Sequence, residues 1–192
     1  ALRAAEPPVI ATALGSLLDS PRAWQHRAEL RPRWIPLVTP LTAHPDPGIR
    51  GRSLALLALL DDHSANSRAL ARAALRDPHP FVRAVACDVL GQTKEPALIH
   101  DLIPLVTDLS EARYELTGWT QLDDQPGHLL HTLPGRPHVA EAALCAVETL
   151  AAGAIRLPFG DRENPTQQLQ ASIAAAQRWY ASNGSRLPPA LP

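Results

Sequence analysis

Apolar residues recur along the chain in one repeated helical pattern. Three segments carry apolar or small residues at positions i, i+4, i+7 and i+8, which line one face of an α-helix. The members of the three stripes are Ile49, Ser53, Leu56 and Leu57; Val82, Ala86, Val89 and Leu90; and Val139, Ala143, Ala146 and Val147. Each stripe predicts an amphipathic helix whose apolar face is covered by a neighbouring element.

The segments around the stripes repeat as well. Residues 44–50 (HPDPGIR) align with residues 77–83 (DPHPFVR) after a shift of 33 positions. Their prolines suit a turn or the first position of a helix, where no amide partner is lost. The pentapeptide IPLVT occurs at residues 35–39 and again 68 positions later, and residues 69–72 form a degenerate copy halfway between.

The repeating unit is therefore a pair of antiparallel helices. An A helix follows each proline-rich turn, and a B helix covers residues 33–43, 65–76 and 96–107. One pair cannot bury both of its faces, whereas stacked pairs can. We predict an all-α fold, an α-solenoid of antiparallel helix pairs.

The motif Asp-Pro-x-x-x-Val-Arg-x-x-Ala-x-x-x-Leu-Gly at residues 77–91, with Leu102, Leu105 and Asp108 further on, resembles a HEAT repeat. It is most similar to the short bacterial kind, called phycobilisome-lyase-like HEAT repeats. The resemblance is good over residues 45–108 and fair over residues 31–44, and it becomes weaker after Asp108.

The resemblance also implies a structural role for a set of charged residues. In the family, the arginine of Val-Arg and an aspartate of the inter-repeat turn form a ladder between neighbouring repeats. The matching residues here are Asp46, Arg50, Asp77, Arg83 and Asp108. In the segment that starts at Val139, the arginine position holds Ala140.

These patterns divide the chain into four parts. Residues 1–30 are expected to form N-terminal capping helices, and residues 31–155 HEAT-like repeats interrupted by a long loop at about 118–137. Residues 156–184 are expected to hold a C-terminal capping helix. Residues 185–192 are expected to be a disordered tail.

Composition narrows the class of protein further. Of the 192 residues, 45% are hydrophobic but only 4% aromatic, so the core must consist of Leu, Ala and Val and favours closely packed helices. The net charge of −1 excludes a generally basic nucleic-acid binder. Charge is nevertheless uneven, because residues 1–76 hold ten Arg against six acidic residues.

Candidate partner contacts lie on the predicted B helices and, for Trp119, in the long loop. Arg68, Arg72 and Arg76 recur every four residues and line one helix face, which would face the concave side of the solenoid. Trp34 and Trp119 are further candidates, because interface hot spots favour Trp and Arg. The alternative interpretation of the arginines is a solvated polar face.

Metal and thiol chemistry receive little support. His128, His131 and His138 near the long loop are weak candidates for a metal site, and ordinary turn histidines are the alternative. Cys87 and Cys145 are expected to be buried free thiols, because equivalent helices of neighbouring repeats stand about 8–10 Å apart and a disulfide needs about 7 Å between Cα atoms. No cofactor is expected.

The chain lacks the common nucleophile, phosphate-loop, dinucleotide and zinc-hydrolase motifs. We therefore predict a non-enzyme: a protein-binding scaffold or accessory subunit whose partner is another protein, within a larger complex. The alternatives are a tetrapyrrole (bilin) lyase-like enzyme, implied only by the repeat type, and a nucleic-acid-binding HEAT protein.

The sequence alone does not decide the cellular compartment. The chain begins at Ala1 and contains no Met, and a small first residue fits signal-peptidase cleavage. Export is the expectation, with a trimmed cytoplasmic chain as the alternative. No stretch of the sequence reaches the roughly 18 apolar residues of a membrane span.

Overall fold

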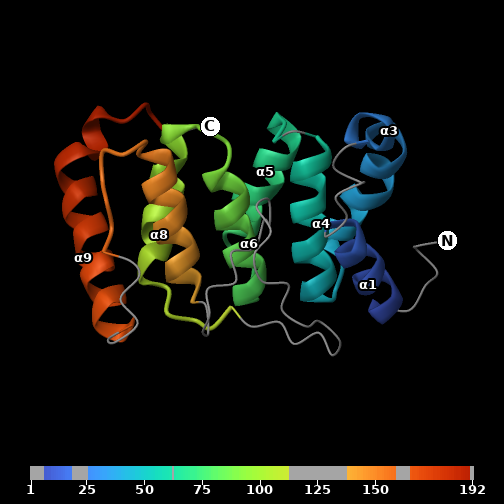
Figure 1. Ribbon diagram of the computed structural model, residues 1–192, viewed down its shortest axis with the longest axis horizontal. Helices are drawn as coiled ribbons and strands as arrows, with labels where there is room; N and C mark the ends of the chain where they lie inside the picture. The colour runs from blue at the N-terminus through green and yellow to red at the C-terminus, as the bar shows by residue number, and fades with distance from the viewer. Residues whose placement is uncertain (1–6, 19–25, 62, 113–137, 159–164, 191–192) are drawn as a thin grey trace.

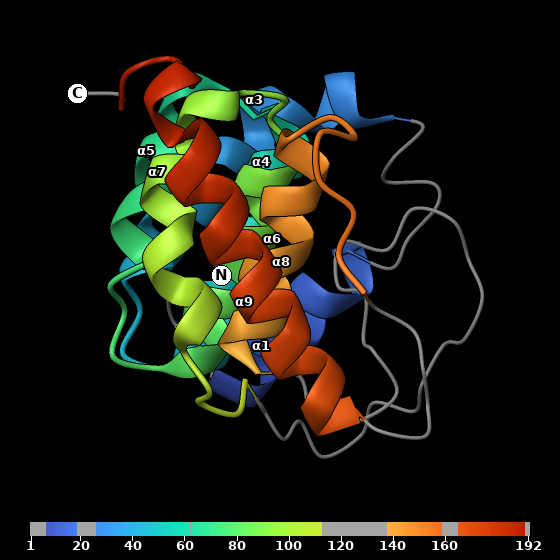
Figure 2. The same cartoon turned by 90° about the vertical axis from the view of Figure 1, so that its left-hand side faces the viewer.

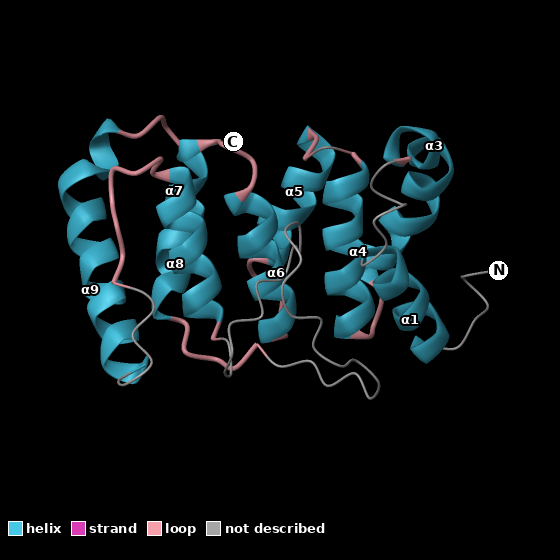
Figure 3. Cartoon of the chain, in the orientation of Figure 1, coloured by secondary structure: helices cyan, strands magenta, loops and turns pink. Residues whose placement is uncertain are grey.

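The computed structural model describes residues 7–18, 26–61, 63–112, 138–158 and 165–190. Their backbone forms helices joined by turns, with one isolated antiparallel bridge between Glu111 and His138 (Figure 3). The elements are α1 (Pro7–Leu18), α3 (Arg27–Val38), η2 (Thr39–Ala43), α4 (Pro47–Leu60), α5 (Ala65–Ala74), α6 (Pro80–Gly91), η3 (Pro96–Leu98), α7 (Ile99–Leu102), η4 (Ile103–Thr107), α8 (Val139–Leu150), α9 (Pro165–Asn183) and η5 (Gly184–Arg186), where η marks a 3₁₀ helix.

Helix starts follow the turn chemistry of the sequence. Pro47 and Pro80 open α4 and α6, where a missing amide costs nothing. The Asp46 carboxylate accepts a hydrogen bond from the amide of Ile49 at 3.0 Å. The side chain of Ser64 caps α5 in the same way. These caps satisfy amides that have no partner inside the helix, and so they fix where each helix begins.

The helices stack in two layers (Figure 1). The A layer consists of α1, α4, α6 and α8, each packed against the next. The B layer consists of α3 with η2, then α5, then η3–α7–η4, and then α9. Figure 2 shows α5 and α7 on one side of the array, and α4, α6 and α8 on the other. The predicted all-α fold and α-solenoid are confirmed.

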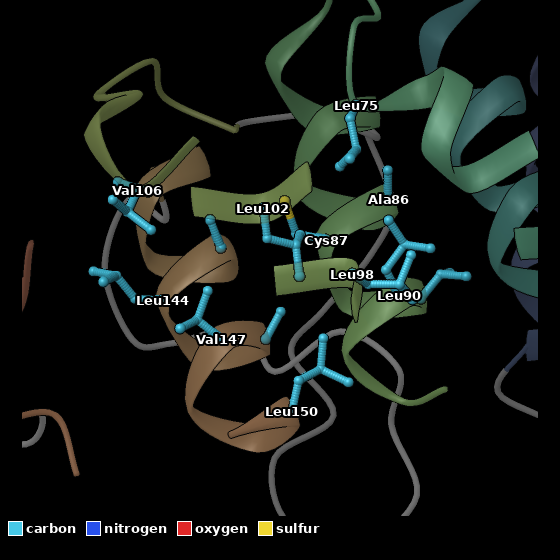
Figure 4. Close-up of a cluster of buried hydrophobic side chains, with 14 of the residues drawn as sticks. Leu75, Ala86, Cys87, Leu90, Leu98, Leu102, Val106, Leu144, Val147 and Leu150 are labelled. Carbon is cyan, nitrogen blue, oxygen red and sulfur yellow. The ribbon is translucent and has the colours of Figure 1, made fainter. Parts of the chain in front are cut away.

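The three predicted stripes form the seam of the A layer. Ile49, Val82 and Val139 are each at most 2% exposed. Leu90 and Val147 of neighbouring A helices lie in one cluster with Leu102 of the B layer (Figure 4). Burial of branched apolar side chains against both neighbours is what holds one helix pair on the next.

Small residues allow the A helices to approach closely, as the composition predicts. A Cβ atom added at Gly91 would stand 3.0 Å from both the Cα and the Cβ of Ala146 on α8. One added at Gly51 would stand 2.5 Å from the ring of Phe81 on α6. A side chain at Gly91 would therefore push α6 and α8 apart, whereas one at Gly51 would displace the ring of Phe81.

The ends of the array differ in detail from the expected divisions. The N-terminal pair is α1 with α3, and its second helix continues past residue 30 into η2. The C-terminal helix, α9, spans Pro165–Asn183. The turn η5 spans Gly184–Arg186 and is followed by an extended Leu187, at the start of the segment 185–192 that the sequence predicts to be a disordered tail. The long loop expected at 118–137, with Trp119, His128 and His131, lies outside the described residues.

Candidate interaction face and inter-repeat ion pairs

Arg50 of α4 connects its own turn to the turn of the following repeat. Its guanidinium donates to both carboxylate oxygens of Asp77, with Nε–Oδ2 and Nη2–Oδ1 distances of 2.8 Å. Its Nη1 donates to the backbone carbonyls of His44 and Pro45, at 2.9 and 2.8 Å. A bidentate pair of this kind fixes geometry as well as charge.

Arg83 of α6 repeats the arrangement one unit later. Its Nε donates to Oδ2 of Asp108 at 2.9 Å, and its Nη2 lies 2.8 Å from the same oxygen. Its Nη1 donates to the carbonyls of Asp77 and Pro78, at 2.8 and 3.2 Å. The two arginines and two aspartates thus form a continuous structure, which we call the A-layer ladder.

The ladder aspartates are held in the charged form. Burial by itself would raise the pKa of Asp77, but hydrogen bonds from Arg50 and the amide of His79, with the arginine's charge, outweigh burial and lower that pKa. Burial opposes ionisation at Asp108 as well, and hydrogen bonds from Ser110 and Arg83 lower its pKa. Both carboxylates therefore depend on their partners for the solvation that they lose on folding.

The ladder changes character at its C-terminal end. At its start, the Asp46 carboxylate caps the amide of Ile49. At the other end α8 carries Ala140, whose amide donates to the backbone carbonyl of Asp108 at 2.8 Å. The next A helix is therefore docked by the backbone where the two preceding ones are docked by arginine.

A second row of ion pairs crosses the B layer. Nη2 of Arg68 lies 3.3 Å from Oε1 of Glu95, and Nε of Arg72 lies 2.9 Å from Oδ2 of Asp101. We call these pairs the B-layer row. Both arginines come from α5 and both acids from the following repeat, so two of the predicted partner contacts also link neighbouring repeats.

Sequence reasoning missed Glu95 and Asp101. A signal was present, because the four inter-repeat pairs of the two groups join an arginine to an acid 25 to 29 positions later. That spacing is slightly shorter than one repeat, so each arginine lies beside an acidic residue of the following repeat.

The remaining predicted contacts have different settings. Arg76, just beyond α5, is exposed. Trp34 is partly buried and packs against the N-terminal apolar cluster that includes Leu14 and Leu41, so most of its role there is structural. The exposed surface of α5 also carries three alanines, Ala65, Ala69 and Ala73. Their small side chains leave little bulk around the arginines.

The third predicted metal candidate, His138, lies at the start of α8. Its amide donates to the carboxylate of Glu141 at 2.7 Å, as in a capping box. Among the residues that the structure describes, no group of three His, Cys, Asp or Glu side chains could hold a metal ion.

The two cysteines are free thiols, as the sequence predicts, but only Cys87 is fully buried and Cys145 is partly buried. Burial raises the pKa of Cys87 well above its ordinary value. Burial, together with the nearby acids Asp88, Glu148 and Glu141, raises the pKa of Cys145 to about 11. Both are therefore protonated at neutral pH and are not the thiolates that nucleophilic chemistry requires.

Fold and surface together define an α-solenoid of stacked helix pairs with an extended, charged B-layer face. A sequence model of HEAT repeats matches residues 35–117, so the chain contains HEAT repeats, and the predicted resemblance is confirmed over that range. No curated protein and no solved structure matches the chain. Across the described helices, none is both long and apolar enough to cross a membrane.

Proposed function

We propose that the chain is a non-catalytic scaffold or accessory subunit that binds another protein through its B-layer face. The partner segment would be acidic. HEAT-type solenoids present extended surfaces of this kind, because each helix pair contributes one strip of the face.

The observation that carries the proposal is the row of arginines on α5 and just beyond its end. Arg76 is exposed, and the side chains of Arg68 and Arg72 keep 30% and 25% of their surface exposed while paired. Arg33 is exposed on the neighbouring B helix α3. An acidic segment lying across these helices would meet several guanidinium groups, which bind carboxylates in a bidentate manner.

The rest of the fold supports binding by keeping this face rigid. The A-layer ladder fixes each helix pair relative to the next, so the arginines of α5 are held in place before a partner arrives. A preorganised surface loses less conformational entropy on association. The alanines between the arginines let a partner backbone approach without displacing large side chains.

Affinity capture from the native source tests this proposal. The full chain is the bait, and it is compared with Arg76→Glu and with Arg156→Glu, an exposed arginine outside the B layer. We expect a specific protein partner whose recovery falls about tenfold with Arg76→Glu, a loss of about 1.4 kcal/mol. Arg156→Glu should leave recovery unchanged.

Equal recovery by both variants would overturn the assignment of the face. Two further assays separate the other function classes. Binding of duplex DNA at low salt, weakened by Arg76→Glu, would replace the proposal by nucleic-acid binding. A change in bilin absorbance on mixing with the chain would point instead to tetrapyrrole handling.

A further inference from the structure

The C-terminal segment returns to the B layer after α9. The turn η5 ends at Arg186, and Leu187 follows with φ −68° and ψ 154°, which is extended backbone. Leu187 is partly buried against the main core cluster. Residues 188–190 are exposed, although the carbonyl of Pro188 reaches back to α7. Figure 2 shows this end of the chain beside α7.

His100 of α7 holds the segment. Its Nε2 lies 2.9 Å from the carbonyl oxygen of Pro188, and its Nδ1 lies 2.7 Å from the hydroxyl of Tyr180. A carbonyl can only accept, so Nε2 carries the hydrogen and donates it. In the neutral ring Nδ1 then accepts from the Tyr180 hydroxyl, and this bond fixes the orientation of the imidazole.

The side chains of His100 and Tyr180 together form a small binding surface, which we call the seat. The rings of His100 and Tyr180 meet edge to face, with centroids 5.7 Å apart and planes at 77°. Tyr180 is held from behind by the turn, because a Cβ atom at Gly184 would stand only 3.1 Å from its ring. The seat therefore combines an aromatic wall with one fixed hydrogen-bond donor.

The bound segment has the properties of a peptide ligand. It offers one apolar anchor, Leu187, and one main-chain acceptor, the carbonyl of Pro188. Pro188 and Pro189 restrict the free segment to extended conformations, which lowers the entropy lost on docking. Aromatic surfaces with a polar donor are a recurring way to bind extended proline-containing peptides.

We infer that His100 and Tyr180 form a binding site for an extended Leu-Pro-containing peptide, occupied in cis by residues 187–190. A partner with such a segment would bind at the α7 end of the B layer by displacing the tail. The inference goes beyond the proposed function and does not depend on the arginines of α5, because the site uses neither their charge nor their side chains.

The test uses a chain ending at Arg186 and a synthetic peptide of residues 184–190 added in trans. We expect the shortened chain to bind the peptide saturably, with shifts in the NMR signals of the His100 ring and of α7. The full chain should bind it at least tenfold more weakly, because its own tail occupies the site. Changing the peptide's leucine to alanine should abolish binding.

Within the shortened chain, His100→Ala should weaken peptide binding by about fivefold, as expected for the loss of one hydrogen bond worth about 1 kcal/mol. The variant Leu187→Asp in the full chain provides a second route, since it releases the tail without shortening the protein. Failure of both opened chains to bind the peptide would overturn the inference. Equal binding by the full and opened chains would do the same.

Discussion

The inter-repeat ion pairs of the described residues fall into two groups that differ in burial and in connection to the backbone. In the A-layer ladder, the side chains of the Arg50–Asp77 pair keep 15% and 12% of their surface exposed. In the B-layer row, the Arg68–Glu95 side chains keep 30% and 33%. Each ladder arginine also binds two carbonyls of its own turn, whereas Arg68 of the B-layer row binds one, that of His63.

The difference shows how one type of contact serves two purposes. Buried, multiply bonded pairs are costly to break, because removal of one partner leaves the other charge without solvation. Pairs that are one-quarter to one-third exposed, as in the B-layer row, gain less, since water competes for both ions. The ladder therefore holds the repeats in register, and under the proposed function it is the arginines of the B-layer row that would turn from Glu95 and Asp101 to the carboxylates of a partner.

The largest effect is expected from Asp77→Ala. It removes both bonds to Arg50 and the acceptor for the amide of His79, and leaves a partly buried guanidinium without a counter-ion. We expect a loss of about 2–3 kcal/mol in the free energy of unfolding, measured by urea denaturation at pH 7. A loss below that expected for the B-layer row would remove the distinction between the two groups.

Acid titration sharpens the comparison next. Because the pKa values of Asp77 and Asp108 are lowered on folding, both contribute stability above the ordinary aspartate value of about 3.9. This stability disappears as pH falls through their lowered values. The double variant Asp77→Asn/Asp108→Asn should be less stable at pH 7 and should lose less stability than the parent between pH 5 and pH 2. Parallel losses in the two chains would contradict this account.

A smaller effect is expected from Arg72→Ala in the B-layer row. The pair with Asp101 is one-quarter exposed on each side, so the cost should be about 0.5–1 kcal/mol and should shrink in high salt. Thermal unfolding at low and high ionic strength measures both quantities, with Arg178→Ala, an exposed arginine of α9, as the control. A cost matching that of Asp77→Ala would mean that the B-layer row is structural.

The smallest effect on stability is expected from Arg76→Glu. Its side chain is exposed, and such surface changes usually stay within about 0.5 kcal/mol. The variant should therefore have the circular dichroism spectrum and unfolding midpoint of the parent. A large drop in the midpoint would show that Arg76 contributes to folding. A loss of partner recovery in this variant would then report unfolding of the chain and not loss of a contact.

Much of the fold follows from local patterns in the sequence. The stripes headed by Ile49, Val82 and Val139 predicted buried helix faces, because helical periodicity alone decides which side chains share a face. The ladder residues came from the HEAT-repeat resemblance. Arg50 and Arg83 occupy equivalent positions one repeat apart, and each pairs with an aspartate of the following turn.

Other contacts had no local signature. The partners of Arg68 and Arg72 depend on how α5 is set against η3–α7–η4, where changes between 3₁₀ and α geometry shift the side chains in a way that a strict helical period does not capture. The docking of the tail joins Pro188 to His100, 88 positions away. A short proline-rich end with no apolar stripe predicts disorder, and no local pattern indicates its contact with His100.

Double-mutant cycles on the two kinds of ion pair test the central claim most directly. Arg50 and Asp77 form one cycle, Arg72 and Asp101 the other, and each residue is replaced by alanine singly and together. The account predicts a coupling of about 2 kcal/mol for the first pair and at most about 1 kcal/mol for the second. Equal couplings, or a larger one for Arg72 and Asp101, would contradict the division between a ladder that holds the solenoid and a row that is open to exchange.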